Sequence, residues 1–348
     1  MVRTLVIGDL HFDNKPHGLL KAQVNCIKRI IHNEEVDDVI FLGDLMMHRK
    51  PYPRVLLALK EVVDFASARA EVTIIRGNHD SENKSDDGVT ALSLFEKQAS
   101  QDMLPYARNR SNRVRVVTQT WYDYRTKRAF IPHYEDEERI KKNLDNVPTG
   151  YTVFGHFGYY GSLNSAGDND FGLVVSDFHN PTILGHIHKY TRGEVITLLG
   201  TPYTTNFAEY KKESFYGVLQ DGELDTFPIE FGPRHLVVDY DMIEENIDWI
   251  NDDKYFTLLR INISTVDKDQ DSIAHLLDIL DVGYVEIKYT PVVDEKYERE
   301  EMQTIDPVTE ISDALVEEYI NSSNTKLGKE ELLKGLNLIH ENKQSRDK

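Results

Sequence analysis

The sequence predicts an α/β protein, because short apolar runs rich in β-branched residues alternate with stretches of helical spacing. Five of these runs stop at a glycine that Asp, Asn or His follows closely. Ligands of open α/β sheets bind at the carboxyl ends of strands, so we expect these polar residues along one edge of one sheet. They are Asp9, His11, Asp44, Asn78, His79, His156, His186 and His188.

The first elements follow in a simple order. Residues 2–7 form the first strand, and the next stretch has the apolar spacing of a helix that covers it, with Leu20, Val24, Ile27 and Ile31. Cys26 lies in this helix and is expected in the core. Residues 55–69 and 89–97 are predicted to be further helices, on either side of the strand at 72–75.

The middle of the chain is predicted to be a hairpin-like strand pair, 113–124 with 127–131. His133 follows without a motif glycine and is expected to be structural. Residues 135–146 indicate a helix or a solvated face. The loop 158–170 is rich in Gly and Asn, as loops that admit substrate often are. Its Tyr159 and Tyr160 would stack on unpaired bases, at about 1–3 kcal/mol per base, or pack against the sheet.

The polar residues at the strand ends suit divalent metal ions. Carboxylate, imidazole and one amide, without cysteine, favour manganese or iron, with zinc as a further candidate. Seven ligands exceed what one tetrahedral ion takes. Two ions about 3.5–4 Å apart, sharing one carboxylate, would leave positions for water and for substrate oxygens, and would together activate water against a phosphoryl group.

Asp-x-His, Gly-Asp, Gly-Asn-His-Asp, Gly-His and Gly-His-x-His occur in this order and resemble the five motifs of the calcineurin-like metallophosphoesterases. Within that superfamily the chain is similar to the SbcD-type nucleases of double-strand-break repair, and especially to their tailed-phage counterparts. Gly-Thr-Pro-Tyr at 200–203 and Glu-Glu-Tyr-Ile-Asn at 317–321 add to the match. The resemblance implies a two-sheet sandwich flanked by helices. It also implies two divalent ions, with manganese first and magnesium as the alternative, and a homodimer.

The resemblance assigns a role to each motif residue. One ion would bind Asp9, His11, Asp44 and His188, and the other Asp44, Asn78, His156 and His186, so that Asp44 bridges them. His79 matches the histidine that contacts the scissile phosphate and protonates the leaving oxygen. Asp80 would either fix His79 or cap a helix.

One position departs from the family pattern. Relatives carry His or Asp three residues after the bridging aspartate, where this chain has Met47, and His48 comes one place later. Either His48 has taken over that catalytic role through a changed loop, or it is a surface histidine. The basic residues that follow, Arg49, Lys50 and Arg54, would contact a DNA backbone or form a solvated loop.

The remaining chain predicts three further units. Strands at 194–199, 214–219 and 224–229 would complete the second sheet, which ends the nuclease domain at residue 232. Residues 233–291 alternate strands and helices, and by resemblance form a small α+β capping domain that orients DNA. An acidic linker, 292–305, precedes a tail, 306–348, with two amphipathic helices. Short helices of this kind need a partner. The resemblance implies the coiled-coil base of an SMC-like ABC ATPase, and packing on the capping domain is the alternative.

Composition limits how the chain can bind DNA and in which compartment it is expected. The net charge is −19, which opposes binding to DNA, because phosphate neutralisation supplies most non-specific affinity. Affinity for DNA must therefore arise from local contacts or be supplied by a partner. A single cysteine excludes an internal disulfide and indicates a reducing compartment. Without an apolar run of membrane length or a signal peptide, the chain is expected to be cytoplasmic, in the host cell if it comes from a phage.

We therefore expect a two-metal phosphodiesterase, a DNA exonuclease on duplex ends and endonuclease on single strands, that acts as the nuclease subunit of a break-repair or recombination complex. Two alternatives share parts of the pattern. A phosphatase or nucleotide phosphodiesterase would share every ligand but need neither the capping domain nor the tail. A non-catalytic scaffold would share the fold but bind metal weakly.

Overall fold

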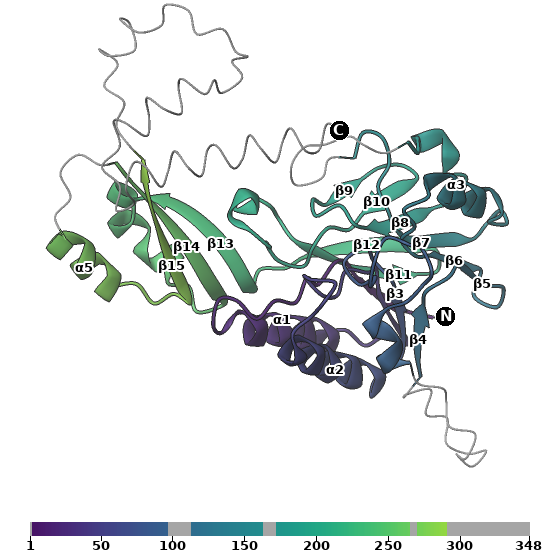
Figure 1. The fold of residues 1–348 in the computed structure, drawn as a ribbon, viewed down its shortest axis with the longest axis horizontal. Coiled ribbons are helices and arrows are strands. Elements are labelled where there is room, and N and C mark those ends of the chain that lie inside the picture. Colours follow the sequence, from purple (N-terminus) through teal and green to yellow (C-terminus); the bar gives the residue numbers. More distant parts are fainter. Residues whose placement is uncertain (1, 97–112, 163–171, 265–269, 291–348) are drawn as a thin grey trace, which may run out of the picture. The chain divides into compact units, whose positions relative to one another are not determined.

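A computed structural model describes residues 2–290 apart from 97–112, 163–171 and 265–269. Residues 1–290 belong to one compact unit. In it two six-stranded sheets and one three-stranded sheet are joined with helices, so the predicted α/β class and two-sheet sandwich are confirmed (Figure 1). No helix within the described ranges is long and apolar enough to cross a membrane.

The first sheet has a parallel centre, β1 to β4, and an antiparallel pair at one edge. In spatial order its strands are β12 (Glu223–Pro228), β11 (Phe215–Gln220), β1 (Thr4–Ile7), β2 (Asp38–Phe41), β3 (Glu71–Ile75) and β4 (Val114–Val117).

The second sheet is also parallel in its centre, with one antiparallel strand at each edge. In spatial order its strands are β5 (Trp121–Asp123), β6 (Arg128–Ile131), β7 (Thr152–His156), β8 (Thr182–Gly185), β10 (Ile196–Leu198) and β9 (Thr191–Arg192).

Alternating side chains of the central strands bury both faces of each sheet. In β1, Leu5 and Ile7 pack in the core on the helical side, whereas Val6 packs in the core between the sheets. In β7, Phe154 faces the same middle core and Val153 faces the outer layer. Apolar strands thus hold the sandwich together without help from the polar strand ends.

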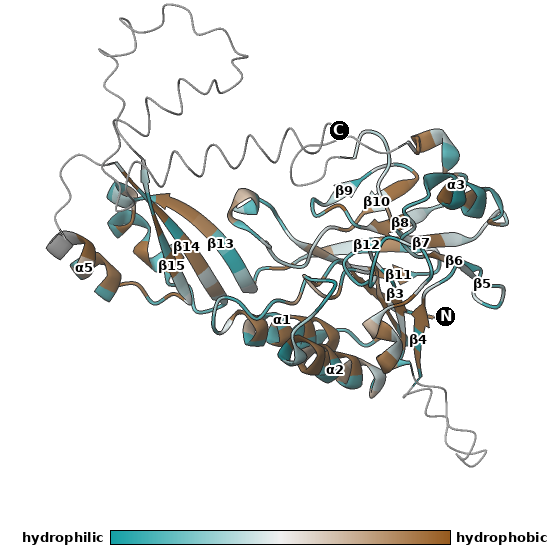
Figure 2. Cartoon of the chain, viewed as in Figure 1, coloured by the Kyte–Doolittle hydropathy of each residue, from teal (hydrophilic) through white to brown (hydrophobic). Residues whose placement is uncertain are grey.

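Helices cover the outer faces. α1 (Leu19–Asn33) and α2 (Pro53–Ser67) pack on the first sheet, and Cys26 is buried in this core as predicted. Both helices show hydrophobic and hydrophilic residues in alternation, as one-sided burial requires (Figure 2). α3 (Glu137–Asp145) packs on the second sheet and is capped by Asp136. Short 3₁₀ turns complete this part: η1 (Ala91–Phe95), η2 (Val175–Asp177) and η3 (Phe207–Glu209).

Three sequence predictions are corrected. The strand predicted at 113–124 is split: β4 joins the first sheet, and only β5 forms the hairpin with β6. The strands predicted at 214–219 and 224–229 add to the first sheet and not to the second. The polar strand ends come from both sheets and not from one edge of one sheet. Apolar periodicity marks a strand, but the pairing partner is decided by long-range packing.

The small sheet consists of three parallel strands with its own hydrophobic core. They are β13 (Gly232–Asp239), β14 (Tyr255–Ser264) and β15 (Tyr284–Thr290), with η4 (Tyr240–Met242), η5 (Glu244–Asn246), α4 (Ile247–Ile250) and α5 (Gln270–Asp278) between them. The division of the chain at 232 and 291 stays a prediction. The predicted linker 292–305, the tail 306–348 and most of the loop 158–170 lie outside the described residues.

Candidate metal centre

The predicted ligands gather between the carboxyl ends of the central strands of both sheets. Asp9 and His11 follow β1, Asp44 follows β2 and Asn78 follows β3. From the second sheet, β7 ends in the buried His156, and His186 and His188 follow β8. The fold therefore brings together all seven residues, although they are spread over nearly 180 positions of the chain.

The first group consists of Asp9, His11 and His188, whose candidate ligand atoms all lie within 4.8 Å of one another. Nε2 of His11 and Nε2 of His188 are 3.0 Å apart. Asp9 is fully buried, and its Oδ2 accepts a hydrogen bond of 2.8 Å from the amide of His186. Its Oδ1 has no hydrogen-bond partner among the described residues.

The second group consists of Asp44, His156 and His186, again within 4.8 Å. Asn78 completes it, because its Oδ1 lies 3.0 Å from Nε2 of His156 and 3.0 Å from Nδ1 of His186. Nδ1 of His156 donates to the carbonyl of Leu42 at 2.8 Å, which leaves Nε2 free to bind.

Asp44 lies between the two groups. Its Oδ2 is 3.7 Å from Nε2 of His11 and 3.4 Å from Nε2 of His156. Its Oδ1 accepts a hydrogen bond of 2.8 Å from the amide of His79. One carboxylate oxygen thus faces both groups, which is the position a bridging ligand needs.

The backbone is strained where it presents these side chains. His11, Asp44 and His186 have positive φ values of 43°, 48° and 81°, and left-handed non-glycine residues cost about 1–3 kcal/mol each. Neighbouring glycines let the chains approach closely. A Cβ at Gly77 would lie 2.1 Å from Oδ1 of Asp44, and one at Gly185 would lie 2.4 Å from Oδ1 of Asp9.

Burial and mutual interaction shift the pKa values. Burial raises the pKa of Asp9 to about 7, and burial lowers that of His11 to about 3. Burial alone would lower the pKa of His156, but Asp44 and Asp9 outweigh it and raise that pKa to about 9. Burial opposes ionisation of Asp44, yet His156 and His11 hold its pKa well below the usual range. His186 stays neutral, since burial keeps its pKa well below the usual value.

These observations fit two divalent cations. Converging ring nitrogens, an orphaned carboxylate oxygen and one amide oxygen form a donor set suited to manganese or iron, with zinc as a further candidate. Each group offers three or four donors and lies within reach of Asp44.

Glu209 was not anticipated from the sequence. Its Oε1 accepts a hydrogen bond of 2.6 Å from Nδ1 of His188, so that Nε2 of His188 faces the first group. Its Oε2 accepts from the amide of Thr205 and from the ammonium of Lys212. Burial opposes ionisation, but His188 and Lys212 hold the pKa of Glu209 well below its usual range. The Asn206-x-x-Glu209 spacing is a helix-start signal, and it does not indicate a metal.

His79 lies beside both groups without belonging to either. Its ring is edge-on to that of His11 at 5.0 Å, and its Nδ1 donates to the carbonyl of Met47 at 2.6 Å. The group that contacts the His79 ring at this loop is therefore the main chain of Met47. His48 is exposed, which favours the surface alternative for that residue.

Asp80 neither contacts the His79 ring nor caps a helix. Its Oδ1 accepts from the amides of Leu45 and Met46 at 3.0 and 3.3 Å, and its Oδ2 accepts from the amide of Gly77 at 3.0 Å. It ties the turn that carries Asn78 to the loop that carries Asp44. Both predicted roles for Asp80 are replaced by this one.

His133, predicted to be structural, lies against the second group. Its ring centroid is 5.7 Å from that of His186 and 6.2 Å from that of His156. Burial lowers its pKa to about 4, and neither ring nitrogen has a hydrogen-bond partner among the described residues. No local sequence pattern marks this position, since no motif glycine precedes His133.

The predicted DNA contacts fall into different environments. Arg49 donates to the carbonyl of Asn83 at 2.8 Å and lies 3.6 Å from Glu135, so its guanidinium is engaged within the protein. Tyr159 packs on the second sheet beside Phe178. The exposed members of the set are Lys50, Arg54 and Tyr160, the last with 63% of its surface exposed.

Comparison with known proteins gives one family. The sequence profile of the calcineurin-like phosphoesterases matches residues 2–190. A search of curated proteins found no match. Among 67 matching solved chains is the nuclease MPE of Pseudomonas putida, 16% identical, covering 64% of this chain and 87% of that chain with a TM-score of 0.31.

Glu209→Gln is expected to weaken metal binding at the first group by about 10–100-fold, because the uncharged amide polarises His188 less. Calorimetric titration of the metal-free protein with Mn²⁺ measures this as one tight and one weakened site. Glu213→Gln, an exposed change on the same loop, is the control and should leave both sites intact. Two unchanged affinities in Glu209→Gln would remove Glu209 from the site.

Metal affinity is expected to rise from about pH 6 to about pH 8.5, because ligands must lose their protons to bind. With its pKa raised to about 7, Asp9 holds a proton at the lower pH, and His156, at about 9, holds one across most of this range. His11, at about 3, is neutral throughout and adds no pH dependence. Titrations in buffers of different ionisation enthalpy measure the protons released; an affinity independent of pH contradicts these assignments.

Proposed function

Because the chain belongs to the calcineurin-like phosphoesterase family, we propose that it is a manganese-dependent DNA nuclease. It would act as an exonuclease on duplex ends and an endonuclease on single strands, within a cytoplasmic break-repair or recombination complex. The observation that carries this proposal is the convergence of all seven predicted ligands, in two groups that flank Asp44.

The division of labour follows from the geometry. Two divalent ions, when bound, would polarise the phosphodiester and lower the pKa of water. Asp9, His11 and His188 would hold one ion, Asn78, His156 and His186 the other, and Asp44 both. Glu209 and the carbonyl of Leu42 orient ligand rings. Asp80 fixes the two loops that carry Asp44 and Asn78.

His79 is placed for proton transfer. A carbonyl can only accept, so the contact with Met47 puts a proton on Nδ1 and leaves Nε2 as the nitrogen that faces the reaction. The backbone amide of His79 donates to Asp44, which fixes the ring next to both groups. In the proposed reaction the protonated Nε2 contacts the scissile phosphate and gives its proton to the leaving oxygen.

The small sheet favours DNA as the substrate rather than a small phosphate ester. The amide of His235, in β13, donates to Oγ1 of Thr204 at 2.7 Å. A cavity of about 60 Å³ is lined by His11 and Thr205 of the main sandwich together with His235 and Leu258 of the small sheet. The small sheet thus forms part of the wall beside the first group, as a cap that orients a long substrate would.

The net charge of −19 favours action within a complex, because the chain alone offers little general affinity for the phosphates of DNA. We propose that a homodimer of this chain binds an SMC-like ABC ATPase through residues 306–348, and that the ATPase supplies the DNA-holding surface. Lys50, Arg54 and Tyr160, which are exposed, would supply local contacts.

The purified chain is expected to digest linear duplex DNA with Mn²⁺ and to be stimulated by the ATPase. Asp44→Ala, which removes the shared ligand, should abolish digestion and metal binding while the apolar sandwich keeps its fold. p-Nitrophenyl phosphate and a nucleotide phosphodiester are the parallel substrates. Rapid hydrolysis of these with intact DNA would favour the phosphatase alternative, and weak metal binding without turnover would favour the scaffold.

His79→Ala should retain both metal ions yet lower turnover by about 10²–10⁴-fold, the range for a lost acid–base group. His48→Ala is the informative comparison, because the exposed ring does not contact His79 and turnover should stay near that of the unaltered chain. Metal analysis accompanies both assays. Loss of metal in His79→Ala would make His79 a ligand, and a comparable rate loss in His48→Ala would restore its predicted catalytic role.

Truncation before Asp306 is expected to leave the weak, salt-sensitive nuclease activity nearly unchanged and to abolish both binding and stimulation by the ATPase. Calorimetry of the two proteins measures the binding. Undiminished affinity of the truncated chain for the ATPase would favour packing of the tail on the capping domain.

A further inference from the structure

A second polar cavity lies at the opposite end of the sandwich. The metal centre follows the carboxyl ends of β1, β2 and β3, whereas this cavity is lined by residues at the amino ends of β2 and β3, among them Asp38, the first residue of β2, and Glu71, the first of β3. Its volume is about 300 Å³, at the lower limit for sites of small organic ligands, about 300–1,000 Å³.

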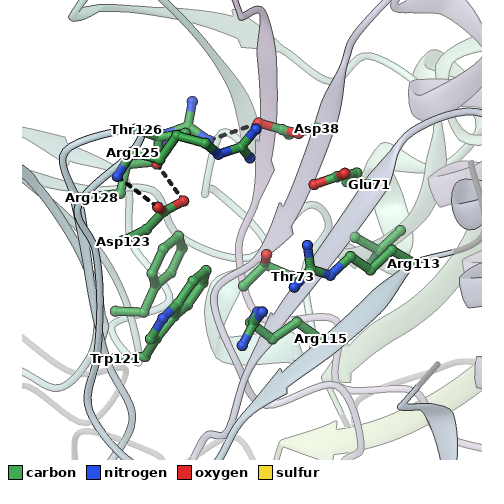
Figure 3. A pocket seen from close by; sticks show the side chains of 12 residues that line it. Asp38, Glu71, Thr73, Arg113, Arg115, Trp121, Asp123, Arg125, Thr126 and Arg128 are labelled. Atoms are coloured by element: carbon green, nitrogen blue, oxygen red, sulfur yellow. Dashed lines mark hydrogen bonds and ion pairs between the residues drawn. The ribbon is translucent and has the colours of Figure 1, made fainter. Parts of the chain in front are cut away.

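The polar lining follows from the alternation of the strands. Thr73 shares the face of Ile75, and Arg115 shares the face of Val117, both in the core between the sheets. Arg128 in β6 shares the face of Phe130 in the same way. The positions that would continue the apolar core at this end are therefore polar, and they point into the space between the sheets (Figure 3).

Some of these charges are matched within the protein. Arg128 lies 2.8 Å from Asp38 and donates to Oγ1 of Thr4 at 2.6 Å, which joins the two sheets. Asp123 accepts from Thr126 at 2.7 Å and from the amide of Arg125 at 3.0 Å. Asp38 is thus paired with Arg128, whereas Asp123 is hydrogen-bonded to neutral groups of its own turn.

Three guanidinium groups of the lining form no ion pair with the described residues. Arg113 and Arg125 make no side-chain hydrogen bond or ion pair with the described residues. Arg115 lies over the ring of Trp121 at 3.9 Å, and that ring stacks on Phe130. Burial and the neighbouring charge of Arg113 lower the pKa of Arg115, although nearby carboxylates, Asp123 and Glu71 among them, oppose this shift. The lining has four arginines and three carboxylates, so positive charge exceeds negative by one.

We propose that this cavity binds a phosphate ester of mononucleotide size, held by the guanidinium groups of Arg113, Arg115 and Arg125. Each guanidinium carries five N–H donors and no acceptor, in a planar arrangement that matches phosphate oxygens. An anion satisfies those donors and relieves the repulsion between Arg113 and Arg115. The shared chemistry admits two sources, a free nucleotide or the end of a DNA strand.

The test titrates 5′-dAMP, inorganic phosphate and a 5′-phosphorylated ten-nucleotide strand into the full-length protein by calorimetry, with Mn²⁺ and again with a chelator. Binding at this cavity should be independent of the metal. Arg115→Ala should weaken it at least tenfold, because a charge-assisted hydrogen bond to phosphate is lost, and Arg115→Lys should recover part of the affinity.

Two further variants keep the result decisive. Arg125→Ala changes an exposed turn residue that the fold does not need, and should weaken binding similarly. Arg69→Ala removes an equal charge stacked on Phe65, outside the cavity, and should have no effect. Tighter binding of 5′-dAMP than of the strand identifies a free nucleotide as the source, and the reverse identifies DNA. The proposal is overturned if none of the three probes binds, or if the Arg115 and Arg125 variants bind them as tightly as the unaltered protein does. Either result holds whether or not the chain is a nuclease.

Discussion

Two carboxylates buried between two sheets impose the main constraint on this structure. Asp9 and Asp44 are 0% and 2% exposed, and isolated buried charges are far too costly to persist without compensation. Imidazole rings, backbone amides and, as we propose, metal cations supply that compensation. The surrounding loops are shaped accordingly: three candidate ligands adopt left-handed backbone conformations, and glycines allow contacts that a Cβ would prevent. Such strain persists only where a rigid scaffold overdetermines it.

The scaffold was largely predictable from the sequence, because apolar periodicity reports burial directly. The strands that precede Asp9, Asp44, Asn78 and His156 appear where the runs of β-branched residues lie. Their assignment to two sheets did not follow, since β11 and β12 resemble any other amphipathic strand and return to pair with β1 through long-range packing.

The candidate site was predictable where its residues belong to local sequence motifs, and it was not predictable where they do not. A glycine that Asp, Asn or His follows closely marked every proposed ligand, and the structure gives the physical reason in the close approach at Gly77 and Gly185. Glu209 and His133 lie beside the same groups with no local pattern. Tertiary folding alone brings them there. Asp80 was noticed, but two of its three bonds to backbone amides go to a loop more than thirty residues away.

The contact between His79 and the carbonyl of Met47 has an evolutionary consequence. A main-chain oxygen is present in every amino acid, so the residue at this position is released from the need to supply an acidic or imidazole side chain. Sequence drift there is then limited by loop conformation and not by chemistry. Homologues that orient the same ring through the backbone would carry varied residues at this point, and motif searches that require a histidine or aspartate would overlook them.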